Sequence, residues 1–322
     1  MFLYLLLLFI GFLVLIAGAF FLVSGASSLA RRYNISTALI GLAVVGFGTS
    51  TPELVVTIYS TIQGRDELAF ANIVGSNIFT VLFVLGVAGL IFPLIIQRNT
   101  VRFEIPLSLI ALTILYVVVN DEVITGVGPD SLDRMDAALM LTVFAGLLVY
   151  MYRSLQAASN LTEPTDKAQS PQVAIGGILL GIAFLTGGAI LVVDYSVAIA
   201  VHFGFSMRLV GISFLAVGTS LPELTTVALS ARRGNTDMAI GNVIGSNLFN
   251  ILFTLPITAL VHPMDYSVSL NADMEVLGIA LITLIAFMFT ISPRKLGRGE
   301  SAVLIAGYLG YIIYRVFGPV GA

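Results

Sequence analysis

The stretch that decides the fold is Gly46-Phe47-Gly48-Thr49-Ser50-Thr51-Pro52-Glu53-Leu54, and a close copy, Ala216-Val217-Gly218-Thr219-Ser220-Leu221-Pro222-Glu223-Leu224, occurs later in the chain. Each copy lies inside a long apolar segment. Each therefore places a carboxylate, at least two hydroxyl groups and a proline at the depth of a lipid bilayer. Polar and charged groups are costly at that depth and are a mark of functional sites.

The composition of the chain indicates an all-α polytopic membrane protein. Of its 322 residues, 58% are hydrophobic and only 10% are charged, whereas soluble domains carry about 25% charged residues. The apolar runs are continuous over the length of a spanning helix and do not alternate as in a membrane barrel. The sequence has no cysteine, no basic patch suited to nucleic acid and no nucleophile–base set. We therefore expect no disulfide, no nucleic-acid partner and no enzymatic activity, and no obligate protein partner is evident.

Hydropathy predicts ten transmembrane helices, each long enough to cross a bilayer. The first has no basic residue before it, so we interpret it as a retained span rather than a cleaved signal peptide. Residues 154–172 form the only long polar connection and are interpreted as a linker. The expected spans are residues 2–29, 36–63, 68–96, 103–119, 135–153, 173–201, 207–231, 236–261, 273–291 and 300–317.

The two sides of this linker, residues 1–153 and 173–322, are related to each other. With an offset of 170 residues, Glu53 aligns with Glu223, and Gly75-Ser76-Asn77 aligns with Gly245-Ser246-Asn247. Residues 36–83 and 206–253 share 19 identities in 48 positions. Chance similarity between apolar segments gives shared Leu and Val, not shared Gly, Pro, Glu and Asn. We therefore predict two five-helix repeats.

An odd number of spans in each half predicts an inverted-topology repeat, because the second half then enters the membrane from the opposite side. The loops after the odd-numbered spans hold 11 of the 15 basic residues. The other side holds four, which are Arg65, Arg134, Arg208 and Arg315. By the positive-inside rule the linker is cytoplasmic. We expect a protein of the plasma or inner membrane with both termini extracytoplasmic.

Each copy of the opening motif has the features of a broken membrane helix. Pro52 and Pro222 lack an amide hydrogen and clash with the preceding turn. The carbonyl groups that the break frees need partners, which at this depth exist only inside protein or in a wet cavity. Hard oxygen donors of this kind are the ligands that Ca²⁺ and Na⁺ prefer. The candidate donors are Gly46, Thr49, Ser50 and Glu53 in the first copy and Ala216, Thr219, Ser220 and Glu223 in the second.

The next span of each half supplies a second layer of polar side chains. Residues four positions apart share one face of a helix, and Gly75 and Gly245 allow close helix approach. Asn77 and Asn247 point away from that face and are expected to join neighbouring helices. The layer consists of Asn72, Ser76 and Thr80 in the first half and Asn242, Ser246 and Asn250 in the second.

Two buried carboxylates balance the charge of one Ca²⁺. Without a cation, two anions at close range would be very unfavourable or would take up protons. A site that must always hold an ion favours obligatory exchange over a channel. A proline in a membrane span often only kinks the helix, and a buried Ser or Asn often only joins two helices. The repetition of the whole set in register favours an ion site instead.

The other ionisable residues near the membrane are interpreted as groups at the level of the lipid headgroups. His202 and His262 lie at span ends, and no second ligand follows either of them at helical spacing, so we expect no metal there. The acidic residues at expected span ends are Glu104, Asp136, Asp194, Asp273 and Glu275.

The paired sequences GTSTPEL and GTSLPEL, followed by NIVGSNIF and NVIGSNLF, resemble the two alpha-repeats of the sodium/calcium exchanger family within the calcium:cation antiporter superfamily. The resemblance covers essentially the whole chain. It implies a Ca²⁺/Na⁺ antiporter without a cofactor, in which spans 1 and 6 slide against the other helices so that a central site faces each side in turn. The residues it implies are Glu53 and Glu223 as main Ca²⁺ ligands, Thr49, Ser50, Thr219, Ser220 and the carbonyls of Gly46 and Ala216 around Ca²⁺ and Na⁺, and Ser76 and Ser246 at the Na⁺ sites.

The chain departs from this family pattern at one layer. Well-known sodium-coupled members resemble it but carry Asn at the position of Thr80 and Asp at the position of Asn250. Proton-coupled relatives also tend to be neutral there. The alternatives to Na⁺ coupling are therefore Ca²⁺/H⁺ exchange and K⁺-dependent exchange, and the alternative from another class is a cation channel. Channels usually build their selectivity rings by oligomeric symmetry, which argues against that class.

Overall fold

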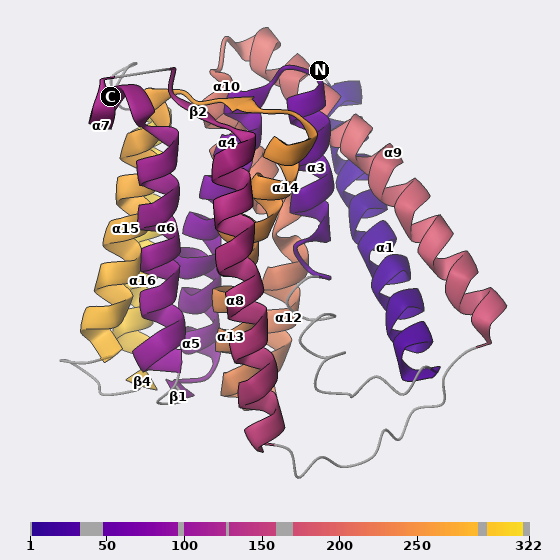
Figure 1. The fold of residues 1–322 in the computed structure, drawn as a ribbon, viewed down its shortest axis with the longest axis vertical. Helices are drawn as coiled ribbons and strands as arrows, with labels where there is room; N and C mark the ends of the chain where they lie inside the picture. Colours follow the sequence, from indigo (N-terminus) through magenta and orange to yellow (C-terminus); the bar gives the residue numbers. More distant parts are fainter. Residues whose placement is uncertain are drawn as a thin grey trace.

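The computed structural model describes residues 2–32, 48–95, 100–126, 129–158, 170–288 and 295–317. These residues are mostly helical (Figure 1), because a chain in lipid must satisfy its backbone hydrogen bonds within each segment. Eight of the described helices are long and apolar enough to cross a membrane. A ninth candidate span is the pair Met207–Thr219 and Leu221–Arg232, whose two parts are bent by 48°.

The helices extend into the range predicted as the linker, since α8 continues to Ala158 and α9 begins at Pro171. The elements are given in two groups, before and after the segment 159–169. Before it lie α1 (Phe2–Arg32), α3 (Thr51–Ile62), α4 (Asp66–Ile78), η2 (Phe79–Val84), α5 (Leu85–Ile91), β1 (Leu94–Ile95), η3 (Thr100–Glu104), α6 (Ile105–Val119), α7 (Asp121–Thr125), β2 (Ser131–Leu132) and α8 (Arg134–Ala158). After it lie α9 (Pro171–Phe203), α10 (Met207–Val210), η4 (Gly211–Leu215), α11 (Ala216–Thr219), α12 (Leu221–Arg232), α13 (Thr236–Phe249), η5 (Asn250–Thr254), α14 (Leu255–Val261), β3 (Met264–Asp265), η6 (Val268–Leu270), α15 (Asn271–Ala286), β4 (Lys295–Leu296) and α16 (Arg298–Phe317).

The expected spans agree with these helices to within a few residues, apart from the span at 36–63. Only its second part, α3, is described, because residues 33–47 lie outside the described ranges. The ten-helix count therefore stays a prediction. The sequence pattern did not predict that η2, η3, η4 and η5 are π-helical, because in spans that are apolar at most positions hydropathy does not register one extra residue in a turn.

Two spans form the centre of the molecule. In the most apolar stretch of Asp66–Ile91, 83% of the residues are buried, and in that of Thr236–Val261, 78% are buried. The corresponding values for the six outer spans range from 22% to 39%. The central spans are α4–η2–α5 and α13–η5–α14, which carry the second layer of polar residues. They belong to one large apolar core with parts of α6, α8, α15 and α16.

Helices α1 and α9 form a pair that lies beside this core (Figure 1). Their backbones are in close contact along the pair. A methyl group on Gly181 would lie 2.5 Å from the amide nitrogen of Leu22, and one on Gly18 would lie 2.7 Å from that of Leu185. The pair also forms an apolar cluster with a few residues of α3, α4, α10 and η4. Small residues at such contacts let membrane helices pack tightly.

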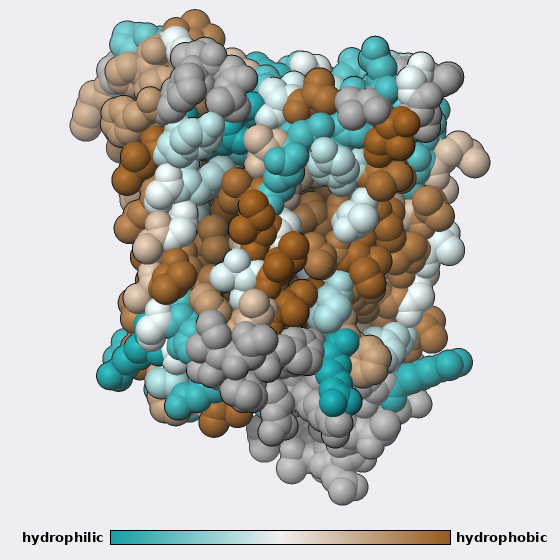
Figure 2. All heavy atoms as spheres, turned by 90° about the vertical axis from the view of Figure 1, so that its left-hand side faces the viewer, coloured by the Kyte–Doolittle hydropathy of each residue, from teal (hydrophilic) through white to brown (hydrophobic). Residues whose placement is uncertain are grey.

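Short antiparallel strand pairs link loops at the two ends of the helices. At one end β1 pairs with β4, with Leu94 opposite Leu296, and at the other β2 pairs with β3, with Ser131 opposite Asp265. Both marked chain termini lie at the end that carries β2 (Figure 1). Figure 2 shows apolar side chains across the middle of one face and hydrophilic side chains at both ends. This distribution matches a protein that crosses a membrane along the helices.

Candidate ion-binding site

Helices α3 and α12 begin at the two copies of the motif. Ser50 and Ser220 occupy the N-cap positions, each motif proline lies in the first positions of its helix, and Glu53 and Glu223 lie in the first turns. The predicted break in the second copy is confirmed, because α11 ends at Thr219 and α12 leaves at an angle of 48°. In the first copy the chain before Gly48, including the predicted donor Gly46, lies outside the described residues.

Each central carboxylate is bound by a serine of the other half. Ser50 Oγ donates a hydrogen bond to Glu223 Oε1 at 3.1 Å, and Ser220 Oγ donates one to Glu53 Oε1 at 2.8 Å. Both glutamates are 1% exposed, and both serines are fully buried. The two motifs, 170 residues apart in sequence, therefore meet in one buried cluster.

The charge of this cluster is not balanced by any described basic side chain. Among the described residues, neither Glu53 nor Glu223 has a salt-bridge partner. Their Oε2 atoms are buried and have no hydrogen-bond partner in the same part of the chain. A buried carboxylate oxygen without a partner carries a large desolvation cost, and a cation is the simplest group that offsets it.

The second layer of the first half contacts the broken helix of the second half. Thr219 Oγ1 donates to Asn72 Oδ1 at 3.3 Å, and Ser76 Oγ donates to the carbonyl of Ala216 at 3.4 Å. Asn72 Nδ2 in turn donates to Thr57 Oγ1 at 3.3 Å. Thr57 was not predicted as a site residue. It lies four positions after Glu53 and so on the same face of α3, which is the signal that identifies it.

In the second half, Asn242 Nδ2 donates to Thr49 Oγ1 at 3.4 Å, which joins α13 to the first motif. Ser246 Oγ donates to the Val243 carbonyl of its own helix at 3.0 Å. The expected close approach at Gly75 is confirmed, because a methyl group there would lie 2.6 Å from Ile212 Cα. No described atom lies within 4 Å of the corresponding position on Gly245.

Four polar side chains join the two central spans one turn further along. Asn250 Nδ2 donates to Asn77 Oδ1 at 3.0 Å, and Thr80 Oγ1 donates to Asn247 Oδ1 at 3.0 Å. Asn77 Nδ2 also donates to the Asn247 carbonyl at 3.4 Å. Asn77 and Asn247 thus lie between the spans, where joining residues are expected. Thr80 and Asn250 contact these asparagines, and their role as ion ligands stays a prediction.

Asp273 lies at the start of α15, at the end of a span as expected. It is not exposed there, since it is fully buried beside Arg208, Arg315 and Tyr311. The position of Asp273 at the start of a span did not reveal the neighbours that α10 and α16 bring to it. By contrast, the Asp194 side chain is 45% exposed and pairs with Arg65 at 3.0 Å.

These features define a helical membrane protein with a buried, acidic, oxygen-rich centre. Among the described residues, no three His, Cys, Asp or Glu side chains gather as a metal cluster, so the carboxylates of this centre are Glu53 and Glu223. Oxygen donors of this type suit hard cations such as Ca²⁺ and Na⁺.

The model of the family described as "Sodium/calcium exchanger protein" matches residues 3–153 and 173–317, and the chain belongs to this family. CaxA of Alkalimonas amylolytica, which bears the name of an antiporter, is 35% identical over 311 residues, covering 94% of this chain and 95% of CaxA. The inner membrane protein YrbG of Escherichia coli (strain K12) is 32% identical over 320 residues, covering 95% of this chain and 94% of YrbG.

A solved structure gives the same assignment. The sodium-calcium exchanger NCX_Mj, soaked with 2.5 mM Na⁺ and 10 mM Sr²⁺, matches with a TM-score of 0.65 and 28% identity, covering 97% of this chain and 98% of that chain. The protein is therefore an integral membrane protein of a Ca²⁺/cation antiporter family, which is a transporter family and not an enzyme family.

Proposed function

We propose that this protein is a secondary active antiporter that exchanges Ca²⁺ for Na⁺ by alternating access at a central site built on Glu53 and Glu223. The observation that carries the proposal is the reciprocal pairing of Ser50 with Glu223 and of Ser220 with Glu53. It leaves one buried oxygen of each carboxylate without a hydrogen-bond partner among the described residues.

Ca²⁺ takes six to eight oxygen ligands, and the cluster offers oxygens of several kinds. Carboxylates supply the charge, and hydroxyl, amide and carbonyl oxygens complete the shell. Na⁺ uses the same hard donors, so the two ions compete for one set of ligands. The proposed ligands are Glu53, Glu223, Thr49, Ser50, Thr219, Ser220, Ser76, Ser246, Thr80, Asn250 and the carbonyls of Gly46 and Ala216.

The charge of the site explains obligatory exchange. Ca²⁺ neutralises two carboxylates, and bound Na⁺ ions also compensate them. Neutralisation lets an occluded site cross between inward-facing and outward-facing states. The site with both carboxylates bare does not cross, because two unpaired charges in a low-dielectric interior are very costly. Ca²⁺ then moves only when a counter-ion returns.

Alternating access is proposed to arise from an inverted repeat of ten spans with both termini extracytoplasmic. The sequence repeat and the reciprocal contacts between the two motifs support this topology. The moving element is proposed to be the α1–α9 pair. The tight glycine contacts within the pair support motion of α1 and α9 as one body.

Ca²⁺/H⁺ exchange is the second candidate, and one observation favours it. Thr80 and Asn250 are neutral and hydrogen-bonded to Asn247 and Asn77. The centre therefore has two acidic groups, which protons could neutralise in place of Na⁺.

Uptake of radioactive Ca²⁺ into proteoliposomes distinguishes the coupling ions. We expect uptake when the vesicles contain Na⁺ and none when they contain only K⁺, whether or not a pH gradient is imposed. Uptake that follows the pH gradient and ignores Na⁺ would assign the protein to proton coupling. Ca²⁺ flux with no counter-ion on the far side would contradict exchange altogether.

A further inference from the structure

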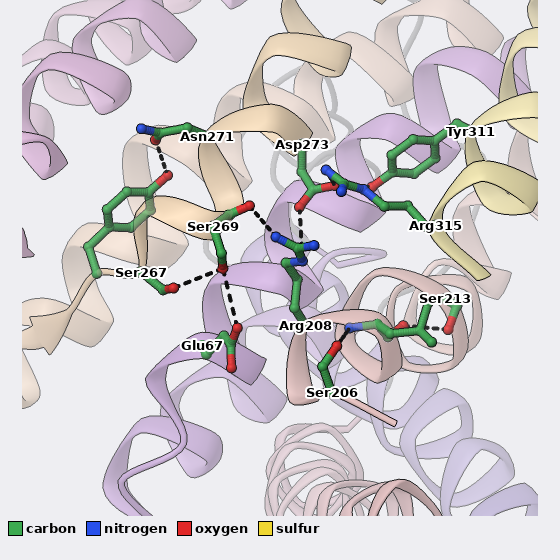
Figure 3. A network of polar contacts seen from close by, with 12 residues as sticks. Glu67, Ser206, Arg208, Ser213, Ser267, Ser269, Asn271, Asp273, Tyr311 and Arg315 are labelled. Atoms are coloured by element: carbon green, nitrogen blue, oxygen red, sulfur yellow. Dashed lines mark hydrogen bonds and ion pairs between the residues drawn. The ribbon is translucent and has the colours of Figure 1, made fainter. Parts of the chain in front are cut away.

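A buried cluster of charged side chains lies at α10, the N-terminal end of the broken helix in the second half (Figure 3). Asp273 Oδ1 accepts a hydrogen bond from Tyr311 at 2.7 Å and lies 2.6 Å from Arg315 Nη2. Asp273 Oδ2 lies 3.9 Å from Arg208 Nε. Arg208 Nη1 also donates to the carbonyl of Ser269.

Because this cluster is buried, the loss of one of its charged members is expected to be costly. The side chain of Asp273 is 0% exposed, that of Arg315 is 4% exposed and that of Arg208 is 14% exposed. Losing one partner from a buried ion pair leaves an uncompensated charge, which is strongly unfavourable. Arg208 is therefore held by two contacts, an ionic contact at 3.9 Å to Asp273 Oδ2 and a hydrogen bond to the carbonyl of Ser269.

The cluster joins four separate elements. Arg208 lies in α10, Ser269 in η6, Asp273 in the first turn of α15, and Tyr311 and Arg315 near the end of α16. Ser269 Oγ also donates to Glu67 Oε1 of α4 at 3.4 Å, so the connection extends to the first turn of the central span (Figure 3).

The chain after Arg208 leads directly to the candidate ion site. Helix α10 continues through the π-helical turn η4 into α11, which carries Ala216 and Thr219 and is followed by Ser220. Close packing fixes its middle, because a methyl group on Gly211 would lie 2.5 Å from Ala71 Cβ. A π-helical turn departs from regular helical hydrogen bonding, so the position of α11 depends on how both parts of this helix are held.

We propose that Arg208 is a positioning residue for ion binding, which holds the half-helix that carries Ala216, Thr219 and Ser220 against α15 and α16. The inference rests on the proposed function. Arg208 does not touch the ion site. It acts by fixing where these oxygen donors lie relative to Glu53.

Arg208 has no counterpart in the first repeat, which argues that it does more than build a broken helix. Within the aligned ranges 36–83 and 206–253, its position corresponds to Ala38. The motif with its proline and glutamate occurs in both halves, whereas this arginine occurs in one. The half-helix that carries Ala216, Thr219 and Ser220 is thus held by a charged side chain that the first half does not encode.

The test compares Na⁺-driven Ca²⁺ uptake by the full chain in proteoliposomes for R208Q, R208K, R315Q and R134Q. We expect R208Q to raise the KM for Ca²⁺ about threefold to tenfold with a smaller change in maximal rate, since Arg208 does not touch the ion and passes on only part of the effect of a lost hydrogen bond to a charged group. Lysine keeps the charge but not the fork that reaches both partners, so R208K should give an intermediate KM.

Two matched variants separate positioning from general stability. R315Q removes the other arginine from Asp273, on a helix that carries no ion-site residue, and should lower the thermal midpoint with KM unchanged. R134Q removes an exposed charge at the start of α8 and should behave as the wild type.

An unchanged KM in R208Q, or an equal rise in KM in R315Q, would overturn the positioning role. If R208Q does not fold, R208K carries the test, and a wild-type KM in R208K overturns the proposal. A wild-type protein without Na⁺-driven uptake would instead contradict the proposed function, which is a distinct result because it does not depend on any variant.

Discussion

The two oxygens of each central carboxylate lie in different environments. The Oε1 atoms of Glu53 and Glu223 accept hydrogen bonds from Ser220 and Ser50, whereas the Oε2 atoms have no hydrogen-bond partner among the described residues. The serines therefore orient each carboxylate so that its second oxygen is left for a cation. Because each serine comes from the opposite half, ion binding depends on how the two halves meet.

Loss of these serine hydroxyls should weaken Ca²⁺ binding in both halves alike. We expect S50A and S220A each to raise the KM for Ca²⁺ by about tenfold to a hundredfold, because a hydrogen bond to a charged group contributes about 1.5–3 kcal/mol. The measurement is Na⁺-driven Ca²⁺ uptake at a series of Ca²⁺ concentrations.

The matched control is S108A, since Ser108 is also fully buried but donates to the carbonyl of Glu104 on its own helix. Its KM should stay at the wild-type value. A KM that rises in only one of the two site variants would contradict the reciprocal arrangement.

Much of the site at the level of single residues was predictable, because Glu53, Glu223 and their flanking hydroxyls recur in register. The partners across the halves were not, since a sequence repeat does not reveal which serine meets which carboxylate. The burial of Asp273 was not predictable for a similar reason. Its partners Arg208 and Arg315 lie on other spans, and hydropathy reports the depth of a residue but not its neighbours.

At the scale of helices, the α1–α9 pair is distinguished by its internal packing. Contacts within the pair involve close backbone approach at Gly18 and Gly181. One of its contacts with the core is an ion pair at one end, where Asp194 of α9 meets Arg65 in the turn between α3 and α4 at 3.0 Å. Sliding of the α1–α9 pair requires contacts between the pair and the core, such as this ion pair, to break.

Cross-linking tests this motion directly. The natural chain has no cysteine, so paired cysteines with a short bismaleimide react only where they are placed. We expect cross-linking of R65C/D194C, which joins α9 to the core, to abolish transport.

Cross-linking of Y4C/Y195C is the matched control, because the rings of Tyr4 and Tyr195 lie 5.8 Å apart within the α1–α9 pair. It should leave transport near the rate of the same variant before cross-linking. Transport that survives in cross-linked R65C/D194C would show that α9 does not move relative to α3 and α4.

The helices themselves were largely predictable, since apolar length alone places a membrane span. The π-helical turns η2 and η5 were not predictable. They fall where Thr80 and Asn250 contact Asn247 and Asn77.

At the scale of the whole molecule, the two halves contribute equally to the centre but not to its surroundings. The motifs meet through reciprocal contacts, while the cluster of Arg208, Asp273 and Arg315 belongs to the second half alone. Repeat detection predicts what the halves share. It cannot predict such differences, because they depend on residues outside the repeated motif.

The central claim is that Glu53 and Glu223 together couple the movement of Ca²⁺ to that of Na⁺. The most direct measurement is uptake of radioactive Ca²⁺ into Na⁺-loaded proteoliposomes for wild type, E53Q, E223Q and E275Q, where Glu275 is an exposed carboxyl at the start of α15. We predict uptake by the wild type and E275Q and none by E53Q or E223Q, because one remaining carboxylate cannot balance Ca²⁺. Wild-type uptake by E53Q or E223Q would contradict the account.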